Sequence, residues 1–280
     1  SPRRVALVFS WPSMWASSER ALPTNQMPVI ERLRAYHRPF FDRNIQLDVV
    51  GPKADLAGYD LVILPQLFLL SDDDAAALRA YVATGGTVVL GAFSGVVDEN
   101  GHVYQGRFPV PLADFTGVSG EGWIPLPEEG LQVDGDLGKF TTKVWAERLR
   151  TEGAEVLAHL VDDGSSLGRT LGQYPAITKN SYEQGTVYYV GLTPPEEVLE
   201  ELLSRIIAET GLEADLPSGL TVPLGVEAVR RGTHIFVLNP QLTAQQITVP
   251  AGSVDLLSGT EISQNYSLAP QEAIVITERS

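Results

Sequence analysis

The alternation of apolar and polar positions is clearest between residues 59 and 95. Residues 61–65 form a short apolar run, typical of a strand buried on both faces of a parallel sheet. Ser71 then has the residue type and position of a helix cap, and Gly85 ends the helical stretch that follows. A second apolar run covers residues 87–90. This order predicts a βαβ unit of a doubly wound sheet, a fold that binds ligands at its strand ends.

The same criteria predict further elements along the first 214 residues. Strands are expected at 5–9, 45–50, 154–160, 175–180 and 186–192, and helices at 27–43 and from a Thr193 cap to Gly211. Pro39 is expected to kink or end the first of these helices. The segment 94–137 is rich in Gly and Pro and predicts a long functional or interface loop.

The pattern changes from Asp215 onward, where short runs of β-type residues alternate with Pro, Gly and Asn turns. Strands are expected at 226–230, 234–238, 246–249 and 273–277. The predicted organisation is therefore an α/β domain at 1–214 with a doubly wound, mostly parallel sheet. A small antiparallel, β-sandwich-like domain at 215–280 follows it.

Composition narrows the functional classes. A formal charge of −15 repels phosphate backbones, so we expect no nucleic-acid partner. The absence of cysteine excludes disulfides, thiolate metal sites and a cysteine nucleophile. No apolar run approaches the roughly 20 residues of a membrane span, and the first residues lack a signal-peptide pattern. We therefore expect a cytoplasmic protein without a membrane partner, and its abrupt first strand suggests a piece of a longer protein.

An ordered set of segments resembles the non-catalytic C-terminal portion of family 42 glycoside hydrolases, the β-galactosidases. The segments are VALVFSWPSMWA (5–16), LRAYHRPFFDRNIQLDVVGPKADLAGYDLVILPQLFLLS (33–71), LRAYVATGGTVVLGAFSGVVDENG (78–101), PAITKNSYEQGTVYYVG (175–191), HIFVLNP (234–240), DLLSG (255–259) and LAPQEAIVI (268–276). Three positions depart from the family pattern. Ser10 stands where an acidic residue is common, Pro39 interrupts a helix, and Pro240 follows Asn239 where a histidine is usual.

The resemblance implies an amidotransferase-like α/β trimerisation domain followed by a small β domain. It also implies that the catalytic (β/α)8 barrel, with both catalytic glutamates, lies outside this chain. The partners of this chain would then be two further copies of itself, in a homotrimer, and the catalytic barrel of the parent chain. The parent would hydrolyse terminal β-galactosides with retention of configuration. We expect no catalytic residue, cofactor or metal site in this chain.

The Asp, Glu, Ser and His side chains that could take part in catalysis or metal binding are interpreted as structural. Asp72, Asp73 and Asp74 suit the first turn of a helix, and Asp98 with Glu99 suits a turn. Glu128, Glu129, Glu196, Glu197, Glu200 and Glu201 are interpreted as solvated loop and helix faces. In GAFSG, Ser94 stands one place late for a nucleophile elbow. The four histidines have no metal spacing, and no glycine-rich phosphate loop follows a strand.

Trp11 and Trp15 are the candidate functional residues, in a loop expected after the first strand. One interpretation places them in the trimer interface, where aromatic anchors are enriched. The other places one of them at the rim of a neighbouring barrel's sugar pocket, because the loop leaves the carboxyl end of a strand. The two are compatible in a trimer.

Two functions from other classes remain open at this point. A stand-alone carbohydrate-binding module would bind galactosides as an isolated chain. A free-standing amidotransferase-like enzyme is disfavoured because the chain has no cysteine.

Overall fold

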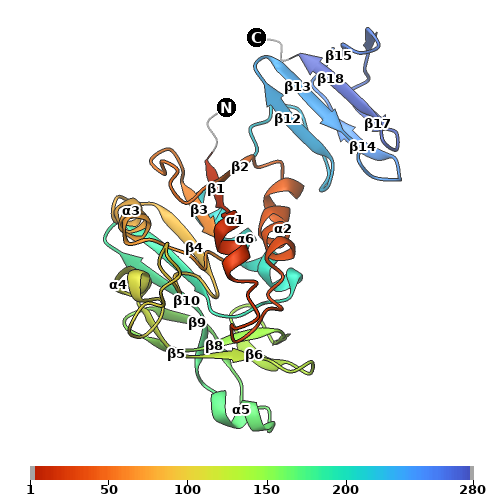
Figure 1. The fold of residues 1–280 in the computed structure, drawn as a ribbon. Coiled ribbons are helices and arrows are strands. Elements are labelled where there is room, and N and C mark those ends of the chain that lie inside the picture. Colours follow the sequence, from red (N-terminus) through yellow and green to blue (C-terminus); the bar gives the residue numbers. More distant parts are fainter. Residues whose placement is uncertain (1–3, 278–280) are drawn as a thin grey trace. The chain divides into compact units, whose positions relative to one another are not determined.

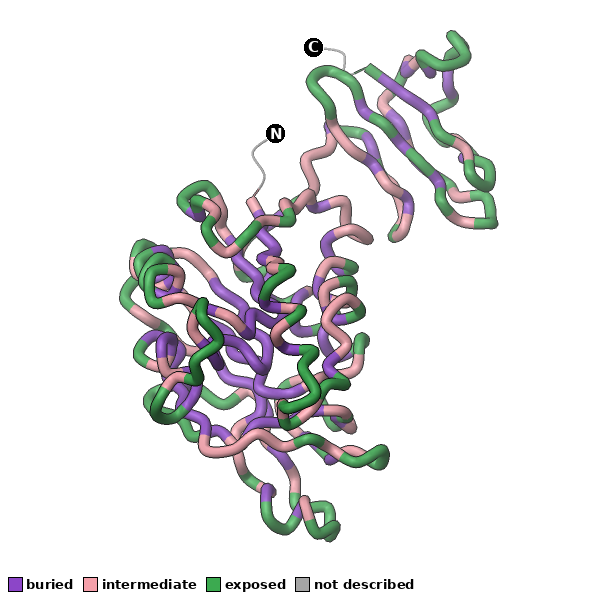
Figure 2. The backbone as a smooth tube through the Cα atoms, viewed as in Figure 1, coloured by how far each residue is buried: buried purple, intermediate pink, exposed green. Residues whose placement is uncertain are grey.

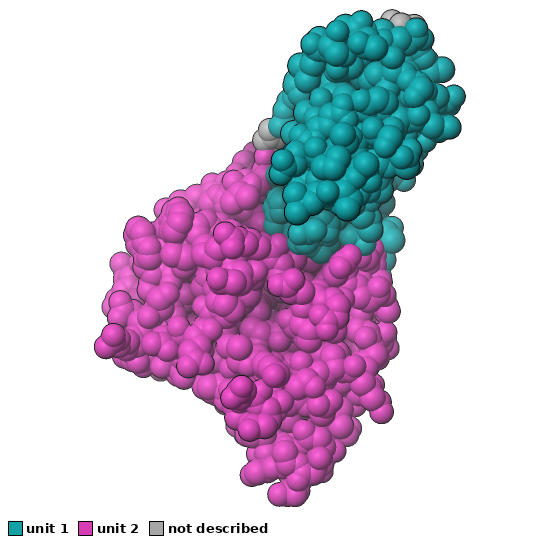
Figure 3. Space-filling model, turned by 90° about the vertical axis from the view of Figure 1, so that its right-hand side faces the viewer, with its two compact units in different colours: residues 1–3, 37–47, 207–280 teal, residues 4–36, 48–206 magenta. Residues whose placement is uncertain are grey.

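The computed structural model describes residues 4–277. The chain divides into two compact units, which are described separately (Figure 3). The larger unit takes residues 4–36 and 48–206. Of the described residues, the smaller unit takes 37–47 and 207–277.

A nine-stranded mixed sheet dominates the larger unit (Figure 1). Its spatial order is β2 (Leu47–Val50), β1 (Val5–Val8), β3 (Leu61–Leu64), β4 (Thr87–Gly91), β11 (Gly185–Val190), β10 (Pro175–Tyr182), β9 (Glu155–Leu160), β6 (Leu131–Gly135) and β7 (Phe140–Thr142). The pairs β1–β3, β3–β4 and β4–β11 are parallel, whereas every pair from β11 to β7 is antiparallel. The mostly parallel sheet predicted from the sequence is therefore correct only for the first half. A short hairpin such as Tyr182–Gly185 can join only antiparallel strands.

The parallel strands β1, β3 and β4 carry the core, and β1 and β3 are buried along their whole length (Figure 2). Alternate residues on one face pack against helix α3 (Asp72–Ala83), as a strand period of two requires. The predicted cap of α3 is confirmed, since the Ser71 hydroxyl accepts a hydrogen bond from the Asp74 N–H at 3.1 Å. Gly85 ends the helix with a φ of +109°, a conformation that other residues rarely adopt.

The remaining helices are α1 (Trp11–Ala16), α2 (Val29–Asp42), α4 (Ala113–Thr116), α5 (Ser166–Leu171) and α6 (Glu196–Thr210), with a 3₁₀ turn at Val110–Leu112. Helix α2 continues through Pro39 to Asp42, so of the two expected effects of that proline, a kink or an end, the end is wrong. The Thr193 cap is also wrong. Its hydroxyl accepts from the Trp145 N–H and donates to the Lys143 carbonyl, and α6 begins three residues later.

The segment 94–137 is not a structureless loop. It contains the 3₁₀ turn, α4 and strand β5 (Val118–Pro125), which pairs with β8 (Trp145–Thr151) in a separate antiparallel ribbon, as well as β6. Strand β5 was not predicted because its sequence, VSGEGWIP, contains glycines, which are depleted in strands. Gly120 is needed there because a Cβ atom at this position would meet the Phe108 ring.

The smaller unit contains three antiparallel sheets. They are β12 (Glu227–Arg231), β13 (His234–Leu238) and β18 (Ala273–Thr277); β14 (Gln245–Thr248) and β17 (Asn265–Leu268); and β15 (Val254–Asp255) and β16 (Thr260–Glu261). The expectation of small antiparallel sheets is confirmed, and three short strands are added to the four predicted. The buried Asp255 organises the DLLSG turn by accepting from the N–H groups of Leu257, Ser258 and Val275. Asn44 joins the 37–47 segment to this unit, because its amide bonds both Val226 and Ala228.

Candidate assembly surface

Trp11 and Trp15 lie one helical turn apart on α1, a helix where the sequence predicted a loop. Their side chains are 54% and 63% exposed, although both are large and apolar. The two ring centroids are 6.3 Å apart, and the Phe9 ring stands edge-on to Trp11 at 4.9 Å. We call this group, Phe9, Trp11 and Trp15, the tryptophan ridge.

Serine hydroxyls hold α1 in place. Six residues are too few for a stable isolated helix, so tertiary contacts must fix it. Ser10 accepts from the Ser13 N–H at 3.3 Å as the N-cap. The buried Ser13 hydroxyl accepts from the Leu69 N–H at 3.0 Å, which ties the inner side of α1 to the loop after β3. The opposite side, with both tryptophans, is left facing outward.

An aromatic core lies beneath α1. Ala16 and Leu22 pack against a cluster formed by Met27, Phe68, Phe93, Val96, Val97 and Trp145. Phe93 is at its centre, with ring centroids 4.8 Å from Phe68 and 4.7 Å from Trp145. Its φ of +65° is left-handed, which is uncommon outside glycine and indicates that its surroundings impose the conformation.

The fully buried Glu147 fixes this conformation. Its Oε1 accepts from the Phe93 N–H at 2.8 Å and from Trp145 Nε1 at 3.3 Å, and its Oε2 accepts from the Tyr189 hydroxyl at 2.7 Å. Burial raises the pKa of Glu147, and these three hydrogen bonds partly oppose the rise. The same burial and the nearby carboxylate raise the pKa of Tyr189.

Arg32 of α2 is a second buried titratable side chain near Glu147. It is buried, and its Nη2 donates to the Pro65 carbonyl at 3.0 Å. Its guanidinium lies 5.8 Å from the centre of the Tyr36 ring. Burial lowers the pKa of Arg32, while Tyr36 and Glu147 oppose the change. We call Arg32, Tyr36, Glu147 and Tyr189 the buried polar cluster; sequence reasoning missed it. One signal for the burial of Glu147 was present in the sequence. Alternate residues of a strand share a face, so in WAERL (145–149) Glu147 lies on the same face as the apolar Trp145 and Leu149.

Ser94 is structural, as its place in GAFSG suggested. Its hydroxyl donates to the Gly91 carbonyl at 2.8 Å and accepts from the Leu67 N–H at 2.9 Å. The residue at the third position of the GAFSG turn is the left-handed Phe93, which has no nucleophilic atom.

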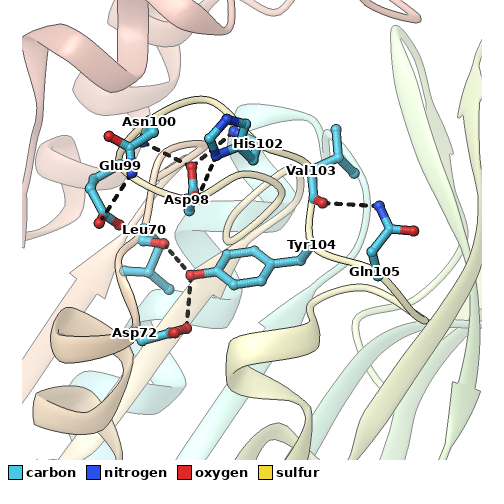
Figure 4. A network of polar contacts seen from close by, with 9 residues as sticks. All are labelled: Leu70, Asp72, Asp98, Glu99, Asn100, His102, Val103, Tyr104 and Gln105. Atoms are coloured by element: carbon cyan, nitrogen blue, oxygen red, sulfur yellow. Dashed lines mark hydrogen bonds and ion pairs between the residues drawn. The ribbon is translucent and has the colours of Figure 1, made fainter.

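Asp72, Asp98 and Glu99 make polar contacts within or to the loop after β4 (Figure 4). Asp98 accepts from the N–H groups of Asn100 and His102, both at 2.8 Å, and these bonds lower its pKa. The Tyr104 hydroxyl bonds the Leu70 carbonyl and the Asp72 carboxylate, both at 2.9 Å, which attaches the loop to the start of α3. The interpretation of Asp98 as a turn residue is confirmed.

A second surface feature is a cavity of about 420 Å³ between α2, the end of β7 and the start of α6. Its walls include Pro28, Ala35, Val144, Pro194 and Pro195. The charged side chains of Glu31, Arg32, Lys143 and Glu196 also line it. The cavity is therefore largely apolar with charges at a few points, a composition typical of binding pockets.

Two kinds of feature are absent from residues 4–277. No group of three or more His, Cys, Asp or Glu side chains in this range could hold a metal ion. No helix in the same range is both long enough and apolar enough to cross a membrane.

Comparison with known proteins identifies the family. Residues 3–213 match the family described as the beta-galactosidase trimerisation domain. The chain belongs to this family. The chain is 33% identical over 236 residues to the beta-galactosidase BgaB of a Geobacillus species. This match covers 84% of this chain and 34% of BgaB. The chain is also 33% identical to an Arthrobacter beta-galactosidase, over 91% of this chain and 36% of the relative.

Solved structures of β-galactosidases share the fold of this trimerisation domain. The enzyme of Bacillus circulans sp. alkalophilus matches with a TM-score of 0.86 at 27% identity, over 100% of this chain and 42% of that one. Gan42B, a GH42 beta-galactosidase from G. stearothermophilus, matches with a TM-score of 0.89 at 26% identity, over 100% and 41%. The chain thus spans about a third to two-fifths of the length of these relatives. The resemblance inferred from the sequence is confirmed.

Proposed function

We propose that this chain is the non-catalytic assembly portion of a retaining β-galactosidase and forms a homotrimer through its α/β domain. The observation that carries the proposal is the tryptophan ridge, an exposed aromatic surface on a domain whose family is named for trimerisation. Clustered exposed aromatic residues mark interaction sites, and Trp is enriched among the residues that dominate binding. The parent's hydrolysis of terminal β-galactosides, the catalytic barrel as partner and the cytoplasmic location belong to the same proposal.

The finer organisation is also proposed. Residues 1–214 would be the trimerisation domain and 215–280 a separate small β domain. The likeness of the first domain to amidotransferases is supported by the turn at GAFSG, which follows a parallel strand as a nucleophile elbow does. Phe93 occupies the elbow position and has no nucleophilic atom, which supports a domain that is inactive alone; the proposal includes no cofactor and no metal.

Light scattering across a range of chain concentrations tests this function. The expected mass is three times the 30.3 kDa of one chain. A chain that stays monomeric at high concentration would contradict self-sufficient assembly. Hydrolysis of a nitrophenyl galactoside by the isolated chain would contradict its non-catalytic role. Galactose or lactose binding by the isolated chain would favour the carbohydrate-binding alternative, and glutamine hydrolysis the amidotransferase alternative.

A further inference from the structure

A cyclic trimer needs two different surfaces on each chain. In a closed ring with threefold symmetry the interface is heterologous: one surface of each copy meets another surface of the next. A trimerisation domain should therefore carry a projecting feature and, elsewhere, a complement to it. The tryptophan ridge and the 420 Å³ cavity are such a pair, and both lie within the larger unit.

The size of the cavity suits the ridge. Ordinary ligand pockets have volumes of roughly 300–1,000 Å³, so a cavity of about 420 Å³ can accept an aromatic side chain. The tryptophans of a chain do not fill its own cavity, because they are 54% and 63% exposed and are not among its lining residues. A tryptophan that enters the cavity therefore belongs to another molecule.

The chemistry of the two surfaces is also complementary. Pro28, Pro194 and Pro195 offer flat apolar faces for an indole ring. An indole N–H is only a donor and needs an acceptor when buried. The carboxylates of Glu31 and Glu196 supply acceptors at the cavity, and Lys143 supplies a cation that can interact with an aromatic face.

We propose that the tryptophan ridge of one copy docks on this cavity of the next copy with an indole ring inside it, and that three such contacts close the ring. The inference rests on the proposed trimer and names the surfaces that meet in it. The occupant of the cavity is a second copy of this chain, because the family is one of trimerisation and the matching projection is on the same domain.

Two variants separate the two surfaces. Trp11→Ala with Trp15→Ala removes the projection and leaves the cavity intact. Ala35→Trp places a large side chain on the cavity wall and leaves the projection intact. Each variant should raise the dissociation constant of the trimer by about 30-fold or more, as truncation of a dominant interface residue does. Val49→Ala, at another exposed apolar residue, should leave it unchanged.

Mixing the two variants is the decisive experiment. One chain then has only a working cavity and the other only a working projection, so a single intact contact can form between them. Sedimentation of the equimolar mixture should show a one-to-one dimer that neither variant forms alone. Circular dichroism and thermal melting of each variant check that both remain folded.

The outcomes distinguish this inference from the proposed function. A wild-type chain that does not trimerise would contradict the assembly proposal and this inference with it. A wild-type trimer that survives loss of both tryptophans would overturn this inference alone. Loss of trimer in both variants without a mixed dimer would also overturn it, since the surfaces would then contact other partners, such as the parent's barrel.

Discussion

Glu147 is the residue on which the interior beneath α1 depends most. It accepts hydrogen bonds from three donors and faces the buried charge of Arg32. Removing the buried acceptor leaves these donors unsatisfied, which costs about 1–3 kcal/mol. We therefore expect Glu147→Ala to lower the free energy of unfolding by about that amount, measured by urea denaturation. Glu147→Gln should cost less because it keeps an acceptor oxygen.

A matched control is available on the surface. Glu152→Ala removes an exposed glutamate and should change the free energy of unfolding by no more than about 0.5 kcal/mol. Equal effects of Glu147→Ala and Glu152→Ala would show that the buried polar cluster does not stabilise the fold.

The raised pKa of Glu147 also predicts a pH dependence. Its ordinary value is 4.5, and the folded state holds the proton more tightly than the unfolded state does. The stability gained from this proton is complete below pH 4.5 and is lost as pH rises through the folded pKa. Glu147→Gln cannot titrate. The stability advantage of the wild type over Glu147→Gln should therefore shrink as the pH rises from below 4.5 through the raised pKa of Glu147. A constant or growing gap in urea unfolding would contradict this.

Buried charges were the part of the interior that sequence reasoning missed. Glu147 and Arg32 look like ordinary surface residues in composition, and their burial depends on the pairing of distant elements. The apolar runs of β1, β3 and β4 were recognisable because local hydrophobicity alone predicts strands buried on both faces. Trp11 and Trp15 were identified by residue type and position, and the structure adds that they share one helix face.

At the scale of elements, α1 tests how a very short helix is held. Ser13→Ala removes the acceptor of the Leu69 N–H and should cost on the order of 1 kcal/mol in the free energy of unfolding. Ser18 is the matched control, since its exposed hydroxyl bonds only the Met14 carbonyl within the same turn. Ser18→Ala should stay within about 0.5 kcal/mol.

Ser13→Ala should also weaken assembly if α1 presents the tryptophan ridge. The variant loosens the helix without changing either indole, so the trimer dissociation constant should rise while the Ser18→Ala constant does not. Amide exchange at Leu69 reports the loosening directly, and unchanged protection there would contradict the role given to Ser13.

Elements with strong end signals were predicted well, and elements defined by partners were not. Helix α3 has a serine cap, three first-turn aspartates and a terminal glycine, all readable in sequence. Strand β5 has glycines where a strand usually has β-branched residues, and it exists because β8 and the Phe108 ring fit against it. Thr193 resembled a cap, but its hydroxyl is used by Lys143 and Trp145, which lie about 50 residues earlier.

At the scale of the whole molecule, the negative charge of the chain opposes assembly, whereas the apolar character of the ridge favours it. Each copy carries a formal charge of −15, so three copies in a ring repel one another. The tryptophan contacts proposed here gain their free energy from apolar burial, which salt does not screen. Salt should therefore act mainly on the repulsion.

The net charge of the copies sets the direction of the salt effect on assembly. The Debye length falls from about 30 Å at 0.01 M to about 8 Å at 0.15 M ionic strength, so the repulsion between copies weakens over that range. The trimer should become tighter as sodium chloride is added, as measured by sedimentation at fixed pH. An interface held by complementary charges would respond in the opposite sense. Weakening of the trimer by salt would therefore show that ion pairs, rather than the tryptophan ridge, hold the copies together.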